Sequence, residues 1–324
     1  MKIAVSSDNH LDVNQVPVDT VLDLQADWLA RHSIDYYLFA GDLFNDYLKT
    51  RDYFTHLQAR VPQTHIYYIL GNHDLLNHVT ADQTEHATDP RYLHNRAVDL
   101  PGSDWRLIGN NGWYDYSFSS YYQQPAAVES WKKVYWLDSS IDQPESDQAR
   151  MARVLQQTTV LLDQAQRDHK RVLFLTHFVP CQHLLAPKPA GIKTARMERV
   201  LQQTRTLLDS AQHDHKQVLF LTHFVPCQYL LALKPAGIKT ARVERFYQMI
   251  NAMLGSNRLG QLLESYPNVK AVFYGHVHGV HPPLDRANLT YFNQAVGVHK
   301  KRHDEWQAAT FADQWKRTVR VIEL

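Results

Sequence analysis

The sequence predicts an α/β protein in which two mixed sheets lie face to face between outer layers of helices, a four-layer α/β/β/α sandwich. Two observations predict this class. Short, continuously apolar segments recur along the chain, as expected for strands that are covered on both faces. The tail from residue 289 onward instead alternates apolar and polar residues, which is typical of strands with one exposed face. Amphipathic helical segments separate the apolar strands and would cover the sheets.

Each element can be placed in chain order, and we expect residues 1–324 to form a single domain. Strands are expected at residues 3–5, 36–40, 66–70, 105–109, 172–175 and 269–274. Alternating strands are expected around 291–296 and 318–322, and these two should together close a second sheet. Helices are expected at residues 18–31, 51–60, 154–165, 246–254 and 259–265. Residues 113–136 are rich in aromatic side chains, and ordinary packing explains them better than the wall of a substrate pocket.

Composition limits the function classes. The chain has 324 residues, with 44% hydrophobic and 21% charged residues, which is ordinary for a soluble enzyme. A formal net charge of +1 gives no electrostatic reason to expect a nucleic-acid or anionic-membrane partner. The first residues lead directly into a strand without the features of a signal peptide, and no apolar run reaches the about 18 residues that span a bilayer. We therefore expect a cytoplasmic protein.

An internal repeat interrupts the second half of the chain. Residues 154–199 and 200–245 align with 38 of 46 positions identical, and each copy contains one helix and one apolar strand that ends in Thr-His. Two units are too few for a solenoid, which needs about three repeats. The sequence therefore predicts a tandem duplication of one helix–strand unit within a complete domain.

Only one copy can place its strand beside the strand at residues 269–274. We favour the second copy, and hence His223 over His177, because short connections between successive elements are the norm. The chain runs from His223 to the helix at residues 246–254 through one loop, whereas from His177 it first passes through the second copy. On this interpretation residues 172–175 form the spare strand.

Polar side chains of the kinds that bind metals follow the apolar strands. Crevices outside the carboxyl ends of strands are where sheets of this kind hold ligands. Each short motif alone is a common polar turn, but the ordered set favours one site of oxygen and nitrogen ligands. The set is Asp8, His10, Asp42, Asn72, His223 with His177 as its alternative, His276 and His278, and His73 and Asp74 follow Asn72 in the same loop.

This order resembles that of the calcineurin-like metallophosphoesterase superfamily, and most closely its small bacterial phosphoesterases. The matching blocks are Asp-x-His at residues 8–10, Gly-Asp at 41–42, Gly-Asn-His-Asp at 71–74, a middle histidine, and Gly-His-x-His at 275–278. The resemblance covers residues 3–278. The duplication departs from the family pattern, because the family needs one middle histidine and this chain offers two.

The resemblance implies a dinuclear metal centre. In it Asp42 would bridge two divalent ions, the first also bound by Asp8, His10 and His278, and the second by Asn72, the middle histidine and His276. Imidazole and oxygen ligands without thiolate suit Mn, Fe, Zn or Ni, of which we favour Mn. His73 would not be a ligand; it would protonate the leaving alkoxide or stabilise charge on the phosphoryl group, and Asp74 would orient its imidazole.

The function implied by the resemblance is hydrolysis of a small-molecule phosphate mono- or diester by a hydroxide that the two metals activate. One alternative is a non-catalytic scaffold with the same fold that binds proteins. Such a scaffold would be expected to lose ligands or the histidine of the Gly-Asn-His motif, and this chain keeps them all. A second alternative is a nuclease, which would need a basic groove that the net charge does not favour.

Overall fold

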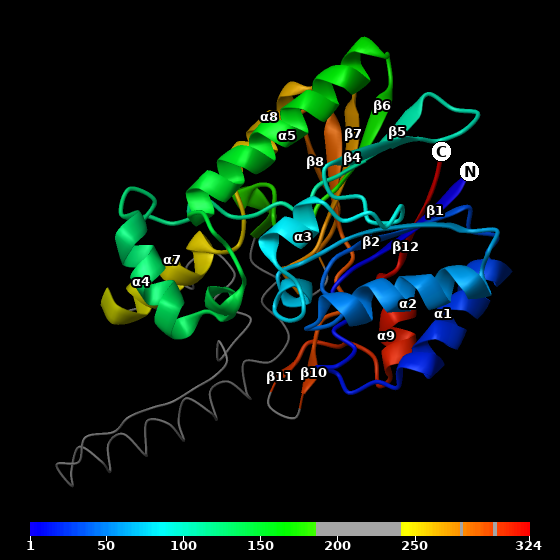
Figure 1. Ribbon diagram of the computed structural model, residues 1–324, viewed down its shortest axis with the longest axis horizontal. Coiled ribbons are helices and arrows are strands. Elements are labelled where there is room, and N and C mark those ends of the chain that lie inside the picture. Colours follow the sequence, from blue (N-terminus) through cyan, green and yellow to red (C-terminus); the bar gives the residue numbers. More distant parts are fainter. Residues whose placement is uncertain (186–240, 279–280, 301–302) are drawn as a thin grey trace, which may run out of the picture.

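Two β-sheets form the centre of the computed structural model (Figure 1), which describes residues 1–185, 241–278, 281–300 and 303–324. The first sheet has the order β12-β1-β2-β3. Strands β1, β2 and β3 are parallel, and β12 pairs antiparallel with β1. The strands are β1 (Lys2–Ser6), β2 (Tyr36–Ala40), β3 (His65–Ile69) and β12 (Arg320–Glu323).

The second sheet has six strands in the order β4-β5-β6-β7-β9-β8. Its four central strands are parallel, and an antiparallel strand lies at each edge. The strands are β4 (Arg96–Asp99), β5 (Trp105–Gly109), β6 (Arg171–Leu175), β7 (Val269–Tyr274), β8 (Leu284–Arg286) and β9 (Leu289–Asn293). In a separate two-stranded sheet, β10 (His299–Lys300) pairs antiparallel with β11 (His303–Asp304).

Alternation of side chains along the strands builds the layers. Leu38 of β2 and Leu173 of β6 belong to one buried cluster, to which both sheets contribute. Their neighbours in sequence, Phe39 and Phe174, point the other way into the cluster that the helices cover. Because successive side chains of a strand point to opposite faces, β2 and β6 are apolar on both faces. The predicted four-layer sandwich of two mixed sheets is confirmed.

Helices cover the outer faces of both sheets (Figure 1). On the first sheet, Phe54 of α2 packs against Phe39 with ring centroids 5.4 Å apart, and Trp28 of α1 meets Trp315 of α9 at 5.2 Å. Helices α5 and α8 lie along the second sheet, and α4 packs on α7 beyond it. The helices are α1 (Val18–Arg31), α2 (Tyr47–Arg60), α3 (Ala81–Glu85), α4 (Pro125–Tyr135), α5 (Asp147–Arg167), α7 (Ala241–Ala252), α8 (Asn257–Ser265) and α9 (Phe311–Thr318).

Capping residues account for where several of the helices begin. The Asp46 side chain accepts a hydrogen bond from the Leu48 amide at 2.9 Å, so α2 begins at Tyr47, before the predicted residue 51. Ser146 and Ser256 cap α5 and α8 in the same way. An N-cap oxygen satisfies amides that have no partner within the helix. The spacing of apolar residues predicts which face of a helix is buried, whereas a single polar capping residue can determine where the helix begins.

The structure corrects two expectations about strands. The position between β5 and β7 is held by residues 171–175 of the first repeat copy, and not by the second copy as we expected. Residues 200–240, including His223, lie outside the described residues. The two alternating tail strands do not close one sheet together: β9 joins the six-stranded sheet and β12 joins the four-stranded sheet.

The chain ends lie side by side, because β1 and β12 are neighbours (Figure 1). The Leu324 amide donates to the Met1 carbonyl at 3.0 Å. Among the described helices, none combines the length and the apolar character needed to cross a bilayer.

Candidate metal centre

The polar residues predicted to form a site follow strands whose carboxyl ends meet at one edge of the sandwich. Four of these residues adopt the left-handed backbone region, which is costly for residues other than glycine. Their φ angles are 53° for Asp8, 44° for His10, 63° for Asp42 and 68° for His276. Such strain persists only where the surrounding structure imposes it, so the loops are built to aim these side chains.

Two glycines let the loops approach each other closely. Gly41 has a φ of +89°, and a Cβ there would lie 2.7 Å from His177 Nδ1. A Cβ on Gly71 would overlap the carboxylate of Asp42. Only glycine fits at these two positions, which explains why a glycine precedes both Asp42 and Asn72.

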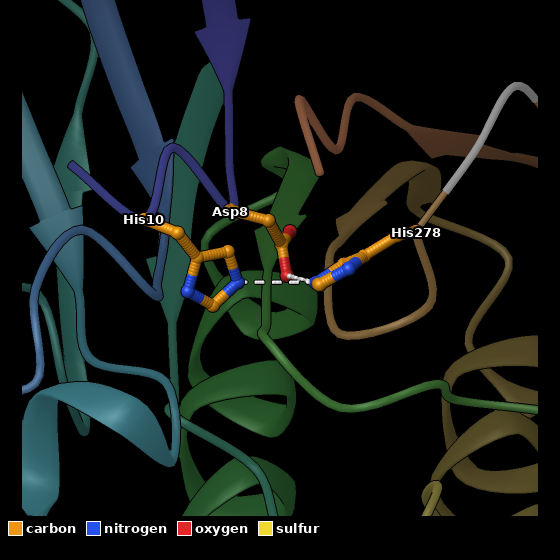
Figure 2. A group of neighbouring side chains, drawn as sticks. All are labelled: Asp8, His10 and His278. Atoms are coloured by element: carbon orange, nitrogen blue, oxygen red, sulfur yellow. Dashed lines mark hydrogen bonds and ion pairs between the residues drawn. The ribbon is translucent and has the colours of Figure 1, made fainter. Parts of the chain in front are cut away.

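Asp8, His10 and His278 form the first donor cluster (Figure 2). His10 Nε2 lies 3.1 Å from His278 Nε2, and His278 Nε2 lies 3.3 Å from Asp8 Oδ1. The loop after β1 and the loop after β7 therefore aim two imidazole nitrogens and one carboxylate oxygen at a common point.

Asn72, His177 and His276 form the second donor cluster. Asn72 Oδ1 lies 3.2 Å from His177 Nε2 and 3.1 Å from His276 Nδ1. Asp42 Oδ2 lies 3.3 Å from His177 Nε2 and 3.7 Å from His10 Nε2. The Asp42 carboxylate therefore lies between the two clusters and reaches both.

Three of the histidines use one ring nitrogen to hold their orientation. Nδ1 of His177 lies 2.8 Å from the Ala40 carbonyl, and Nε2 of His276 lies 3.2 Å from the Met253 carbonyl. Nδ1 of His278 lies 2.6 Å from the Glu305 carboxylate. Donation to these oxygens fixes the ring orientation, so that in the neutral ring the other nitrogen faces the site with its lone pair.

These donors fit divalent cations. Ligand atoms about 2.1 Å from an ion lie about 3.0–3.4 Å from each other in octahedral or tetrahedral geometry, which matches most of the separations above. Among the described residues, Asp8 Oδ2 is buried and accepts no hydrogen bond, although a buried carboxylate oxygen needs a partner. A divalent cation would supply a partner for such a buried carboxylate oxygen.

The titratable groups of the site shift one another strongly. Burial alone would lower the pKa of His177, but the charge of Asp42 and a hydrogen bond to it raise that pKa to about 9. Burial opposes ionisation of Asp42 as well, yet His177 and His73 hold the pKa of Asp42 well below its usual range. Burial lowers the pKa values of His10 and His276, so these two rings are neutral and ready to bind a metal.

His73 lies at the rim of the site and is only partly buried. Its ring centroid is 4.6 Å from that of His10, and its backbone amide donates to Asp42 Oδ1 at 2.9 Å. Its Nδ1 lies 2.7 Å from Asn45 Oδ1. The amide oxygen of Asn45 therefore orients the imidazole, and one His73 ring nitrogen lies within 4.8 Å of donor atoms of His10 and Asp42.

Asp74 does not orient His73, so that expectation is wrong. The short 3₁₀ helix η1 (His73–Leu75) turns Asp74 into the core. There its carboxylate accepts hydrogen bonds from the backbone amides of Asp42 at 2.7 Å and Gly71 at 2.9 Å, and from the Thr50 hydroxyl at 2.6 Å. Asp74 therefore holds together the two loops that carry Asp42 and Asn72.

The structure brings together Asp8, His10, Asp42, Asn72, His276 and His278, as the sequence predicts, and adds residues that the sequence analysis missed. Asn45 follows Asp42 by three positions, so its place in the same loop was an available signal. Asp138 and Glu305 contact Asn72 and His278 from distant parts of the chain, and no motif marks them. At the middle-histidine position the structure places His177, the alternative to His223.

A four-layer sandwich with clustered imidazole and carboxylate groups defines a class of protein suited to metal-dependent hydrolysis. Family comparison agrees, because the calcineurin-like phosphoesterase model matches residues 1–280. The chain belongs to the calcineurin-like phosphoesterase family, a family of phosphoester hydrolases that typically use divalent metals.

One solved structure supports the fold, and a second shows a weaker similarity. A phosphopantetheinyl hydrolase from Mycobacterium tuberculosis is similar with a TM-score of 0.58 and 14% identity, covering 99% of this chain and 95% of that chain. A dimetal phosphatase from Danio rerio is similar with a TM-score of 0.46 and 11% identity, covering 93% of this chain and 89% of that chain. A comparison with curated proteins finds no match.

Proposed function

We propose that this protein hydrolyses a small-molecule phosphate mono- or diester at a centre of two divalent metal ions. The position of Asp42 is the observation that carries the proposal. Its Oδ2 lies 3.7 Å from His10 of one donor cluster and 3.3 Å from His177 of the other. A single carboxylate within reach of both clusters is the arrangement that lets one residue bridge two ions.

Each ion would have four protein ligands. Asp8, His10 and His278 would bind the first ion, and Asn72, His177 and His276 the second, with Asp42 shared. These donors are imidazole, carboxylate and amide groups without thiolate, which suits Mn, Fe, Zn or Ni. We favour Mn, because oxygen donors hold a large share of both sites.

The protein residues would divide the remaining work. When bound, the ions supply positive charge for the phosphoryl oxygens and lower the pKa of a water molecule. Asn45 occupies Nδ1 of His73, so Nε2 would be the ring nitrogen that donates a proton to the departing oxygen of the ester. Asp74 keeps the loops of Asp42 and Asn72 together through backbone amides.

The geometry favours catalysis over a purely structural scaffold. Four residues of the donor set have strained backbones, and a scaffold gains nothing from that cost. Buried acceptors that converge on common points are likewise unfavourable unless a proton or a metal ion lies between them.

The test is a phosphoesterase panel with the purified protein after chelation and after re-addition of Mn²⁺. The substrates are para-nitrophenyl phosphate, its bis ester, its phenylphosphonate analogue and cyclic nucleotides. We expect hydrolysis of at least one ester, loss of activity on chelation and recovery with metal. The Asp42→Asn variant should lose bound metal and turnover together, because it removes the shared negative charge. Full activity of that variant after chelation and metal re-addition would contradict the proposal.

A further inference from the structure

Asn72 meets the second donor cluster with only one end of its side-chain amide. Its oxygen lies 3.2 Å from His177 Nε2 and 3.1 Å from His276 Nδ1. Its nitrogen points away and donates to Asp138 Oδ1 at 2.8 Å. Asn72 and Asp138 are both almost fully buried, at 4% and 2% exposed, so water does not substitute for this contact.

Asp138 is itself held in place. It lies in the 3₁₀ helix η2 (Leu137–Ser140), directly after α4. Its second oxygen accepts a hydrogen bond from the Trp136 indole at 3.0 Å. Both carboxylate oxygens therefore face donors, and Asp138 can act toward Asn72 only as an acceptor.

The two ends of a carboxamide have nearly the same shape, so packing alone does not select between them. If the Asn72 amide turned over, its NH₂ group would face His177 and His276, and it would have no lone pair to offer a metal. Asp138 Oδ1 lies behind the amide and excludes this reversed orientation. In the reversed orientation the Asn72 oxygen would face the Asp138 oxygen, and no hydrogen could lie between them.

The two donor clusters also differ in charge. Asp8 gives the first cluster a carboxylate of its own. Within the described residues, the second cluster consists of two histidines and one neutral amide, and its only carboxylate is the shared Asp42. The second site therefore depends more on the orientation and polarisation of its amide ligand.

We propose that Asp138 is a positioning residue for the second metal ion: it holds the Asn72 amide with its oxygen toward the ion and polarises that oxygen. The inference rests on the dinuclear centre proposed above. It assigns a role to the helical segment at residues 125–140, which is distant in sequence from the other residues of the site.

The test compares three variants by metal binding to the apo protein, with Mn²⁺ as the probe, using calorimetry and metal analysis. In Asp138→Asn, one acceptor oxygen faces two donors, Asn72 Nδ2 and Trp136 Nε1. We expect the second Mn²⁺ to bind about 10–100-fold more weakly, as is typical when a group that supports a ligand is lost. The first Mn²⁺ should bind as in the wild-type protein.

The swapped pair supplies the rescue. In the Asn72→Asp and Asp138→Asn double variant, the new amide at position 138 can donate to the carboxylate at 72 and accept from Trp136, so every hydrogen bond is restored. Asn72→Asp alone sets two buried carboxylates against each other and should also weaken the second site. We expect the double variant to bind the second Mn²⁺ more tightly than either single variant, a non-additivity that marks direct coupling.

Glu129→Gln on α4 is the matched control, because it removes a carboxylate from the same helical segment and should bind both ions normally. Circular dichroism of each apo variant checks the fold. Unchanged binding of the second ion by Asp138→Asn would overturn the inference, as would a double variant no better than the weaker single variant. A wild-type protein that binds one ion or none would instead overturn the dinuclear centre itself.

Discussion

At the residue scale, protons and metal ions compete for the same lone pairs. Burial opposes the charged form of His278, but Glu305 and Asp8 raise its pKa well above its usual value. Asp42 raises the pKa of His177 to about 9. Both rings are therefore in the charged form at neutral pH when no metal is bound, with a proton on each ring nitrogen. Metal binding must displace one proton from each ring.

Metal affinity should consequently rise with pH up to about 9. A raised pKa favours the protonated form below it, so acidification stabilises the metal-free state and weakens binding. Calorimetric titration with Mn²⁺ at pH 7.5, repeated in buffers with different ionisation enthalpies, should report net proton release. A binding enthalpy that does not depend on the buffer would contradict this prediction.

A His73 ring nitrogen lies within 4.8 Å of donor atoms of His10 and Asp42, but we propose that His73 is not a ligand, so its removal should separate catalysis from metal binding. We expect His73→Ala to keep both ions and to slow hydrolysis by about 10²–10⁴-fold, the usual contribution of a positioned proton donor. The loss should be greatest for alkyl esters, which have poor leaving groups, and smallest for para-nitrophenyl esters. An equal loss for both kinds of ester would argue that His73 acts in another way.

Local motifs explain why most of the candidate site could be predicted. Asp42 and Asn72 come directly after apolar strands, and strand order then brings the strand ends together. The supporting residues could not be found in this way, because Asp138 contacts Asn72 across 66 residues and Glu305 contacts His278 across 27 residues. Asp74 was misassigned because adjacency in sequence to His73 does not show which way a 3₁₀ turn points its side chain.

At the element scale, the choice between repeat copies depends on which strand lies between β5 and β7. Strand β6 is paired on both sides and buried along residues 172–175. Both copies have the strand sequence Val-Leu-Phe-Leu followed by Thr-His, so apolar pattern and connection length do not distinguish them. Cross-strand pairing and the contact of His177 with Ala40 distinguish them in the structure.

We therefore expect His177→Ala to abolish binding of the second metal ion and to lower phosphoesterase activity sharply, and His223→Ala to leave both unchanged. The two substitutions have the same chemistry in nearly identical local sequences, so each is the matched control for the other. Measurements are metal content and turnover after reconstitution with Mn²⁺. The opposite result would assign the ligand to the second copy after all.

At the scale of the whole molecule, the fold is closed by strands from the tail. β12 pairs with β1, and β9 pairs with β7. The alternating pattern predicted both strands but placed them in one sheet, because alternation shows that one face is exposed and does not show which partner a strand has. The sequence pattern therefore could not predict which sheet each tail strand joins.

The repeat allows a deletion that leaves its own junction almost unchanged. Removing residues 195–240 joins Thr194 to Ala241, and the seven residues before the new junction, 188–194, are identical to the natural residues 234–240. Because β6 and His177 precede the deletion and α7 begins at Ala241, we expect the shortened protein to keep both metal ions and its activity.

The deletion also decides whether the copies can exchange places. His177→Ala in the full chain leaves a second Thr-His sequence that could take the same strand position, whereas the shortened chain has none. Residual activity of His177→Ala in the full chain that disappears in the shortened chain would show exchange. Complete loss in both backgrounds, which we expect, would show that the site uses the first copy alone, because β6 is already paired on both edges. Loss of metal binding in the shortened chain that still contains His177, with an intact circular dichroism spectrum, would instead show that the second copy contributes to the site.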